Sequence, residues 1–422
     1  MGKKRYATET VAASAPPSAF AEMFPDSANL DRWTGQSSGG RGTAVVSPVD
    51  LYNYLTNGGF DFIQRWPTAL TTNNGGSGWA ARYNQQATDR QPCFDDWMIT
   101  TQTASSQVGR IDSLVTPIAG SVSRYYAQFK QITGAGKQLI SHLVEYKDVA
   151  NMRGKTVRIQ FKLATGAWGS ASAVRVGLLQ NNVSATADTV AASFISAFGA
   201  NTVDPTWGTN LALVAPTLVE SSAVTQPTIV NSAMTIANPG ASLTFTRYSM
   251  TVAVPSNCVN IILAIWTDSQ MSINDVWNFA EADIHLGQSI NDWMPLSTQQ
   301  EEARVNRNST KSFSKDVTPV QTAGVNTGEM KFIAGIIGAL AERSPSIMLP
   351  CPMRIPIVTA HVTLFNPAAA NAQVRDETAG ADCSATAFVA GSDRNFAVTC
   401  TGAAGTIVGG LLGVHYFVDQ MP

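Results

Sequence analysis

The feature that most constrains this chain is an alternation of apolar and polar residues with a period of two. Between residues 155 and 163, every second residue is apolar and the residues between are polar; the apolar ones are Val157, Ile159, Phe161 and Leu163. This alternation is typical of an antiparallel strand that buries one face. It returns at 174–178, 259–265 and 412–418, with turn residues between the runs. The sequence therefore predicts an all-β protein built from sandwiches.

Composition excludes several classes of function. Charged residues make up 14% of the chain, against about 25% in an average soluble protein. Lys and Arg total 28 and Asp and Glu total 30, which gives a net charge of −2. A nucleic-acid-binding protein carries a basic excess, so we expect no nucleic-acid partner.

Targeting signals and cysteines point to the cytoplasm of the producing cell. The basic residues 3–5 are not followed by the apolar core that a secretion signal needs. The apolar stretch 332–341 is too short to span a bilayer, so we expect no membrane partner. The five Cys never form a C-x-x-C pair. In a reducing compartment they are expected to be small buried apolar residues, and no metal or cofactor is predicted.

The N-terminal segment 1–54 is predicted to be an extended arm. Residues 1–46 are polar and irregular, with scattered apolar anchors, and such a segment orders only against another surface. We expect Phe20, Phe24 and Trp33 to contact that surface. A Ser-Pro-Val-Asp run at Ser47 resembles a helix start, so a short helix is expected before Asn57.

Two β-domains are expected after the arm, at 55–296 and 297–422. The joint between them begins at Ser297, where Ser297 with Gln300, or Thr298 with Glu301, fits a capping box. We predict a linking helix from there towards Asn306, followed by a smaller all-β unit.

Motifs that resemble catalytic sites have simpler explanations in this chain. Gly35-Gln-Ser-Ser-Gly39 fits the pattern of a hydrolase nucleophile elbow, but it lies in a Gly/Ser linker and not between a strand and a helix. The segment 153–156 lacks the first glycine of a phosphate-binding loop. The pair Asp95-Asp96 is explained by a solvated loop, with Ca²⁺ ligation as an alternative. The pair Glu301-Glu302 is explained by the first turn of a helix.

The His residues offer no metal-binding spacing. His142, His361 and His415 are isolated in the sequence. Asp283 and His285 would share one strand face with Trp277, Phe279 and Glu281, either as a polar groove or as a mixed face near a sheet edge.

Several segments together resemble a domain common in virion proteins of tailed bacteriophages. Residues 57–66 read NGGFDFIQRW, and Asp89-Arg90 and Trp97 follow. The strand-like segments are MRGKTVRIQF at 152–161, FTRYSMTVAVP at 245–255 and ADIHLGQ at 282–288, with Met294-Pro295 after them. The segments at 324–326, 350–354, 365–367 and 414–416 resemble the C-terminal unit that often follows this domain.

The resemblance covers roughly residues 55–422 and implies a jelly-roll sandwich similar to carbohydrate-binding modules. It implies a fibre, appendage or head-decoration protein of the virion. We therefore expect a non-enzymatic structural protein, assembled in the bacterial cytoplasm and located in the virion. Its arm would dock on head, neck or tail proteins, and the fibre analogy suggests a homotrimer.

The remaining candidate residues are aromatic. Trp66, Trp79, Tyr83 and Trp97 lie in loop-like surroundings, as do Trp168 and Trp207. Exposed Trp and Tyr can stack on sugar rings, whereas buried ones fill cores. A receptor-binding module for host surface polysaccharide is therefore an alternative function, with Trp66, Trp79, Tyr83 and Trp97 as its contacts. An enzyme that degrades polysaccharide is a further alternative, without an acid/base pair in the sequence to support it.

Overall fold

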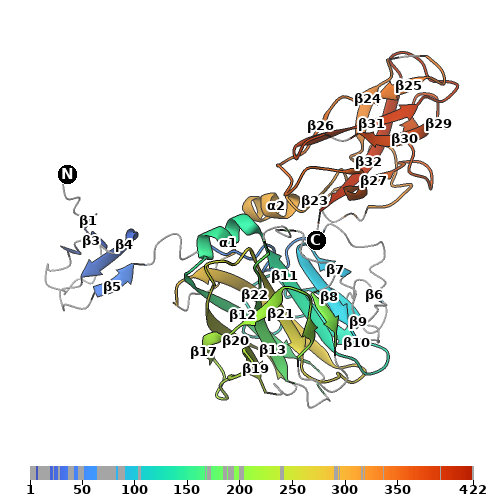
Figure 1. The fold of residues 1–422 in the computed structure, drawn as a ribbon. Helices are drawn as coiled ribbons and strands as arrows, with labels where there is room; N and C mark the ends of the chain where they lie inside the picture. Colours follow the sequence, from blue (N-terminus) through green and yellow to red (C-terminus); the bar gives the residue numbers. More distant parts are fainter. Residues whose placement is uncertain are drawn as a thin grey trace.

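The structure is a computed structural model in which the elements fall into three groups along the chain (Figure 1). It describes short strands before residue 46, then residues 52–63, 82–83 and 91–102. It further describes residues 106–420, apart from gaps at 167, 169–172, 184–187, 189–193, 199–203, 238–241, 289–292, 294, 315–316, 318, 336 and 390.

Two large antiparallel sheets form the first domain, as the alternation predicts. The first sheet has the order β17 (Pro216–Ser221), β20 (Ser242–Ala253), β12 (Thr156–Thr165), β22 (Val276–Leu286), β10 (Tyr125–Gln131), β9 (Ser106–Asp112) and β6 (Arg82–Tyr83). The second has the order β18 (Thr228–Val230), β19 (Ala233–Ile236), β13 (Val174–Asn181), β21 (Asn260–Thr267), β11 (Gln138–Val144), β8 (Trp97–Thr101) and β7 (Gln91–Phe94). β16 (Leu211–Val214) also pairs with β13, and β14 (Ile195–Ala197) pairs with β15 (Thr206–Trp207).

The main core lies between these sheets. Val157, Ile159, Phe161 and Leu163 of β12 are all buried in it, and burial of each such side chain contributes roughly 1.5–3 kcal/mol. A second cluster covers the outer face of the eight-stranded sheet, where Trp266 packs edge-on against Trp207 at 5.1 Å. The all-β, jelly-roll sandwich expectation is confirmed.

The prediction that Trp277 and Phe279 share one strand face with Asp283 and His285 is wrong, because β22 contains a bulge. The register of β12 against β22 shifts between Gln160 and Lys162, and Glu281 has a φ of +53°. The bulge changes which face each later residue occupies, so Trp277 and Phe279 enter the core whereas Asp283 and His285 do not. The carboxylate of Glu281 holds the 121–123 loop by accepting hydrogen bonds from its backbone and from the hydroxyl of Ser121.

In the N-terminal segment the structure describes short paired strands, and the domain bounds predicted there stay a prediction. β1 (Tyr6–Ala7) pairs with β2 (Phe20–Ala21), and β3 (Met23–Asp26), β4 (Asn29–Gln36) and β5 (Gly42–Val45) form one sheet. The helix expected from Ser47 is absent from the described residues 52–60. There the backbone N–H of Tyr54 bonds to Ile284 O at 2.8 Å and the side-chain amide of Asn53 bonds to Ala282 O at 3.1 Å. These contacts with β22 replace the local bonds of a helix.

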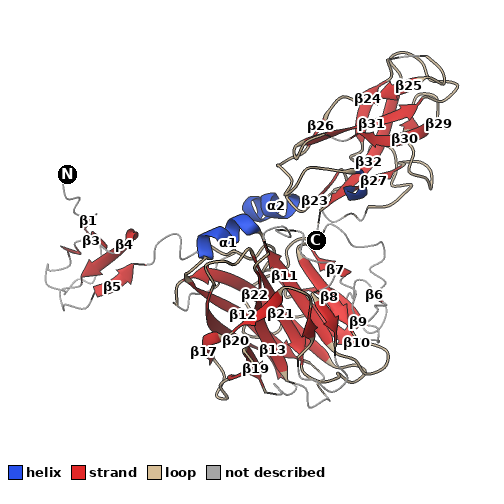
Figure 2. Cartoon of the chain, viewed as in Figure 1, coloured by secondary structure: helices blue, strands red, loops and turns tan. Residues whose placement is uncertain are grey.

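Two short helices lie where the sandwich meets the C-terminal domain (Figure 2). They are α1 (Tyr146–Met152) and α2 (Thr298–Asn306). The predicted capping box of α2 is confirmed, since Ser297 caps the helix and Gln300 completes the box.

The C-terminal domain consists of two smaller sheets. β32 (Leu411–Asp419) pairs with β23 (Ser309–Lys311), β24 (Met330–Ile333), β27 (Val362–Phe365) and β28 (Arg375–Asp376), and β28 pairs with β29 (Ala381–Asp382). β31 (Asn395–Thr401) pairs with β25 (Ala341–Arg343), β26 (Ile347–Met348) and β30 (Ser384–Val389). A 3-10 turn occupies Thr359–His361. The alternating residues Leu412, Val414 and Val418 lie in this domain's own core.

Candidate functional site

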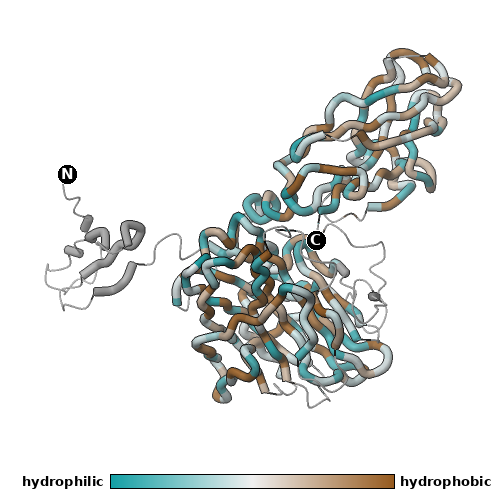
Figure 3. The backbone as a smooth tube through the Cα atoms, in the orientation of Figure 1, coloured by the Kyte–Doolittle hydropathy of each residue, from teal (hydrophilic) through white to brown (hydrophobic). Residues whose placement is uncertain are grey.

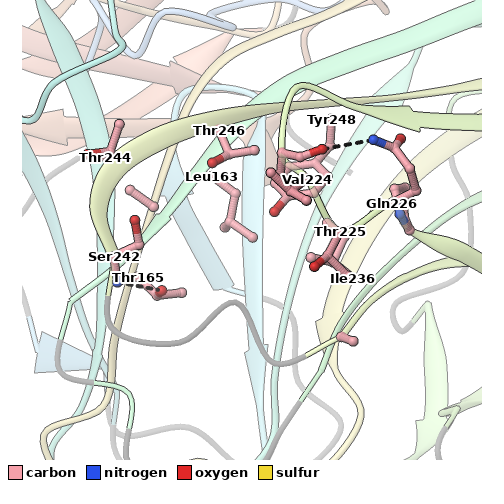
Figure 4. Close-up of a pocket in the computed structure, with 14 residues that line it drawn as sticks. Leu163, Thr165, Val224, Thr225, Gln226, Ile236, Ser242, Thr244, Thr246 and Tyr248 are labelled. Carbon is pink, nitrogen blue, oxygen red and sulfur yellow. Dashed lines mark hydrogen bonds between the residues drawn. The ribbon is translucent and has the colours of Figure 1, made fainter.

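A cleft of about 350 Å³ opens at one end of the sandwich. One wall is formed by the end of β12 and the start of β20, and the other is the loop 222–227 between β17 and β18 (Figure 4). The register of β12 against β20 shifts between Leu163 and Thr165. This irregularity lies where the two strands line the cleft.

The loop wall is held in place by one side chain. Gln226 Nε2 donates to Ser221 O at 3.2 Å and to Ala223 O at 2.8 Å, while its carbonyl oxygen accepts from Ser221 N at 2.9 Å. Val224 at the tip of this loop is fully exposed. The loop is thus fixed at its base and presents an apolar side chain to the solvent.

The chemistry of the cleft is neutral. Its lining carries hydroxyl groups and a single amide between small apolar side chains, and no lining residue is charged; the hydroxyl-bearing residues are Thr165, Thr225, Ser242, Thr244, Thr246 and Tyr248. Tyr248 is 6% exposed, and burial raises the pKa of its phenol. Such a lining suits a neutral ligand that offers several hydroxyl groups and small apolar faces.

The sequence contained a signal for this cleft that was missed. Ser242, Thr244, Thr246 and Tyr248 are spaced by two, so they occupy the same face of a strand. The opposite wall carries no comparable signal, since it depends on a loop that folds back.

The predicted aromatic contacts do not form one site among the described residues. Trp66 and Trp79 lie outside the described residues, and Tyr83 lies in β6, whose backbone pairs with Ser106 of β9. Phe20, Phe24 and Trp33 lie in β2, β3 and β4, respectively.

Trp97 is a correction, because its side chain is 1% exposed and cannot stack on a sugar. It lies in the main core, in edge-on contact with His142 at 5.0 Å and with Phe279 at 5.5 Å. Its indole N–H donates to Asn57 O at 3.2 Å. Trp168 is also buried, and Trp207 packs on Trp266.

The motif residues of the opening segment meet at a structural corner. Asn57 adopts a φ of 55°, and its side chain bonds to both the N–H and the carbonyl of Phe62. Gly58 lies so close to β22 that a Cβ there would be 2.1 Å from Ala282 O. The N–H of Asn57 donates to Glu301 of α2. We call Asn57, Gly58, Trp97, Ala282 and Glu301 the motif corner.

His142 of β11 contacts Thr56 and Trp97 next to the motif corner. It is 2% exposed, and its Nε2 lies 3.2 Å from Thr56 N and 3.1 Å from Thr56 O. Burial, together with the charge of Arg304, lowers the pKa of His142 to about 3. The imidazole is therefore neutral at physiological pH.

A network of charges joins the domains. Arg307 at the end of α2 pairs with Glu145 of the sandwich at 2.8 Å. Arg354 of the C-terminal domain donates to Asp188 O of the sandwich at 2.7 Å and also to Gln420 O. Burial raises the pKa of Glu145, although Arg307 opposes the shift. We call Glu145, Asp188, Arg307 and Arg354 the domain joint.

One arrangement in the C-terminal domain resembles a catalytic triad. Ser312 Oγ lies 3.0 Å from His415 Nδ1, and Glu329 Oε2 lies 3.8 Å from His415 Nε2. His415 is fully buried and stacks on Phe313 at 4.2 Å, and Ser312 Oγ accepts the N–H of Tyr416 at 3.0 Å. Ser312 is partly buried and its Oγ is engaged by both contacts, while His415 Nε2 lies 3.1 Å from Thr327 Oγ1, nearer than Glu329. We therefore assign this network to packing between β32 and its neighbours.

The described part of the chain has free thiols and lacks both a metal-ligand cluster and a membrane-spanning helix. No group of three or more metal-ligating side chains occurs among the described residues. Cys93, Cys258, Cys383 and Cys400 are buried and Cys351 is partly buried, and all five are free thiols. Within the described residues, no helix has the length and apolar character needed to cross a bilayer.

The comparisons with known proteins concern the fold. No family pattern matches the sequence, and no curated protein is similar to it. Solved structures with a similar arrangement include the enzymatically active domain of bacteriophage CBA120 tailspike protein 4, at 8% identity and a TM-score of 0.26, covering 46% of this chain and 19% of that chain.

Two carbohydrate-related structures are also similar. Modules of a Clostridium thermocellum endo-1,4-beta-D-xylanase complexed with xylohexaose match at 11% identity and a TM-score of 0.27, covering 50% of this chain and 30% of that one. TmCBM61 in complex with beta-1,4-galactotriose matches at 12% identity and a TM-score of 0.27, covering 56% of this chain and 99% of that chain. This chain spans less than a third of the tailspike and xylanase chains. At these TM-scores the likenesses carry no argument about function.

Proposed function

We propose that this chain is a non-enzymatic structural protein of a tailed bacteriophage virion, an exposed fibre or appendage anchored by its N-terminal residues 1–54. The observation that carries the proposal is the motif corner. The opening segment, Trp97 and the closing segment are distant in sequence and belong to the resemblance to phage virion proteins. In the structure their residues contact one another and α2.

This convergence explains why these residues occur together. Asn57 and Gly58 shape a turn that accepts the Trp97 indole and β22, and Glu301 ties that turn to the helix that leads to the second domain. The motif set is therefore a requirement of a two-domain β-scaffold, which is what a projecting structural protein needs. The domain joint adds charged contacts that restrain the second domain relative to the first.

The non-enzymatic part of the proposal is supported by the hydrogen bonds and burial of the Ser312, His415 and Glu329 network. Ser312 is engaged by the backbone of β32, and its His415 partner is enclosed. A direct check is the release of reducing sugars from host polysaccharide, which the proposal expects to be absent and which would contradict it if measured.

Removal of residues 1–46 tests the anchoring role. The truncated protein should keep its β-domains, seen as an unchanged thermal transition, and should be missing from purified particles. Truncated protein that enters particles at the normal level would contradict an N-terminal anchor. Attachment to the capsid surface, as a decoration or head fibre, is the alternative location within the same proposal.

A second candidate function, binding of host surface glycan, is favoured by the cleft and not by the predicted aromatics. Its neutral, hydroxyl-rich lining matches the chemistry of an uncharged sugar. Thr246→Val should weaken binding of host polysaccharide about tenfold or more in calorimetric titration, and Thr228→Val on the exposed strand β18 is the matched control. Equal binding by both variants would exclude the cleft.

A further inference from the structure

Two buried thiols lie next to each other in the C-terminal domain, where hydrophobic stretches of the chain alternate with hydrophilic ones (Figure 3). Cys400 lies on β31, and Cys383 lies in the connection between β29 and β30. β30 and β31 run side by side (Figure 1), and Ser384 pairs with Thr401, so each cysteine directly precedes a member of this pair. Cys383 is 0% exposed and Cys400 is 2% exposed, and both belong to the core of the domain.

The sulfur atoms of these two residues interact directly. The thiol of Cys400 donates a hydrogen bond to the sulfur of Cys383, which also accepts the backbone N–H of Ala403. The proton of each other thiol goes to a backbone carbonyl: Cys93 donates to Trp97 O at 3.4 Å, Cys258 to Asn260 O at 3.1 Å and Cys351 to Ala303 O at 3.6 Å. Cys383 and Cys400 are thus the two thiols of the chain that are hydrogen-bonded to each other.

This contact makes Cys383 the more reactive thiol of the pair. The hydrogen bond from Cys400, together with the N–H of Ala403, lowers the pKa of Cys383. Burial and two nearby carboxylates, Asp376 and Asp382, act against this shift without reversing it. The hydrogen bond to Cys383, together with burial, raises the pKa of Cys400, and burial raises the pKa of each of the other three thiols. Because the thiolate is the form that oxidants attack, Cys383 reacts first and has a second thiol beside it.

A metal ion is the other common partner of two neighbouring thiols, and a structural zinc site needs four ligands. No group of three or more metal-ligating side chains occurs in the part of the chain that the structure describes. A disulfide needs these two residues alone.

We propose that Cys383 and Cys400 are a disulfide-forming pair, which a hydroperoxide such as hydrogen peroxide converts into a covalent cross-link. The thiolate of Cys383 attacks one peroxide oxygen, the O–O bond breaks, and a sulfenic acid and hydroxide are formed. The hydroxide takes up the proton that Cys383 has lost. The sulfur of Cys400 then attacks the sulfenic sulfur, so the S–S bond forms, the S–O bond breaks, and the thiol proton leaves with the hydroxyl group as water. Two thiols are oxidised, and one peroxide is reduced to two waters.

The cross-link would join the two small sheets of the domain. Cys383 lies where the chain passes from the sheet of β32 to the sheet of β31, and its N–H donates to Val374 O at 2.8 Å. A disulfide to Cys400 fixes this crossing to β31 and restricts the unfolded chain, which stabilises the domain. The bacterial cytoplasm is reducing and the medium outside is oxidising. The pair would therefore close after particles leave the host; this last step rests on the proposed function.

Peptide mapping of the full chain tests the proposal. The reduced protein is treated with hydrogen peroxide, the remaining thiols are blocked with N-ethylmaleimide in urea, and the peptides are analysed without reduction. We expect a linked peptide pair that contains Cys383 and Cys400, with a mass loss of two hydrogen atoms that dithiothreitol reverses. Cys93→Ala, which removes a buried thiol of the sandwich, is the matched control and should form the link as wild type does.

The thermal stability of the oxidised protein gives a second readout. Peroxide should raise the calorimetric transition of the C-terminal domain by about 10 °C. The transition that tryptophan fluorescence reports should stay unchanged, because the C-terminal domain has no Trp. Peroxide should raise neither transition in Cys400→Ala.

Three outcomes would overturn the proposal. Cys383 and Cys400 could both be recovered as thiols after a peroxide dose that oxidises Cys351, which is partly buried. Cys383 could end as a sulfinic acid in the wild type without a link to Cys400. The third outcome is that every disulfide found joins two chains through Cys351. None of these outcomes affects the truncation test of the anchoring arm, so the two proposals can fail separately.

Discussion

Acid sensitivity that arises at His142 gives a quantitative test of the motif corner. The pKa of His142 is about 3 in the folded protein, against an ordinary value of 6.5. Between these two values the unfolded chain binds a proton that the native protein does not bind. Stability is therefore complete above pH 6.5 and falls as the pH drops below it.

The expected loss follows from this difference. Each pH unit between the two pKa values costs about 1.4 kcal/mol, and integration from pH 7 to pH 5 gives about 2 kcal/mol. Burial raises the pKa values of Glu145, Asp148 and Glu301. These groups act in the opposite direction, because their native state binds protons more tightly. Comparison with a variant therefore isolates the contribution of His142.

Urea unfolding followed by tryptophan fluorescence is the appropriate assay. The chain has 9 Trp, all before Ser297, and only Trp33 precedes residue 55. The signal therefore comes mainly from the sandwich and not from the C-terminal domain. The wild type should lose about 2 kcal/mol more than His142→Gln between pH 7 and pH 5. His361→Gln is the control: burial and the charge of Arg354 also lower the pKa of His361, but this residue lies in the C-terminal domain, which has no Trp. Equal losses in wild type and His142→Gln would refute the assignment of a neutral, buried imidazole.

Three further predictions concern the corner, the joint and the thiols. Gly58→Ala should lower the free energy of unfolding by about 1–3 kcal/mol, because its Cβ would lie 2.1 Å from Ala282 O. Gly335→Ala is the control: the nearest atom to its Cβ would be Glu342 Oε2 at 3.7 Å, so the free energy of unfolding should change by less than about 0.5 kcal/mol. Similar shifts in melting temperature for the two variants would contradict this prediction. Arg307→Met should remove the ion pair with Glu145 and lower the free energy of unfolding by about 1.5–3 kcal/mol. It should also broaden the distribution of distances between the two domains in small-angle scattering. An unchanged scattering profile would show that the domain joint does not depend on this pair. Of the five thiols, Cys351 should be alkylated first in the native protein because the other four are buried, and peptide mass spectrometry showing early modification of Cys93 would contradict the core packing.

Local patterns in the sequence were sufficient for the elements whose determinants are local. The period of two at 155–163 predicted β12, and the Ser297 box predicted the start of α2. Each depends on neighbouring residues or on one buried face, so tertiary contacts do not change the outcome.

The predictions that were wrong or missing concern features that depend on contacts between residues distant in sequence. Trp97 looks like a loop aromatic in sequence, and only its contacts with Asn57 and His142 show that it belongs to the core. The bulge at Glu281 depends on the 121–123 loop, which lies far away in sequence. The cleft was missed because only its strand wall, with hydroxyl residues spaced by two, leaves a trace in the sequence.

Immunogold electron microscopy of purified phage particles, with an antibody against residues 298–422, tests the central claim most directly. The account predicts label on particles, on slender projections at the neck or tail for a fibre, or over the capsid for a head fibre or decoration protein. Particles without label, together with free protein in the lysate, would contradict a structural role in the virion.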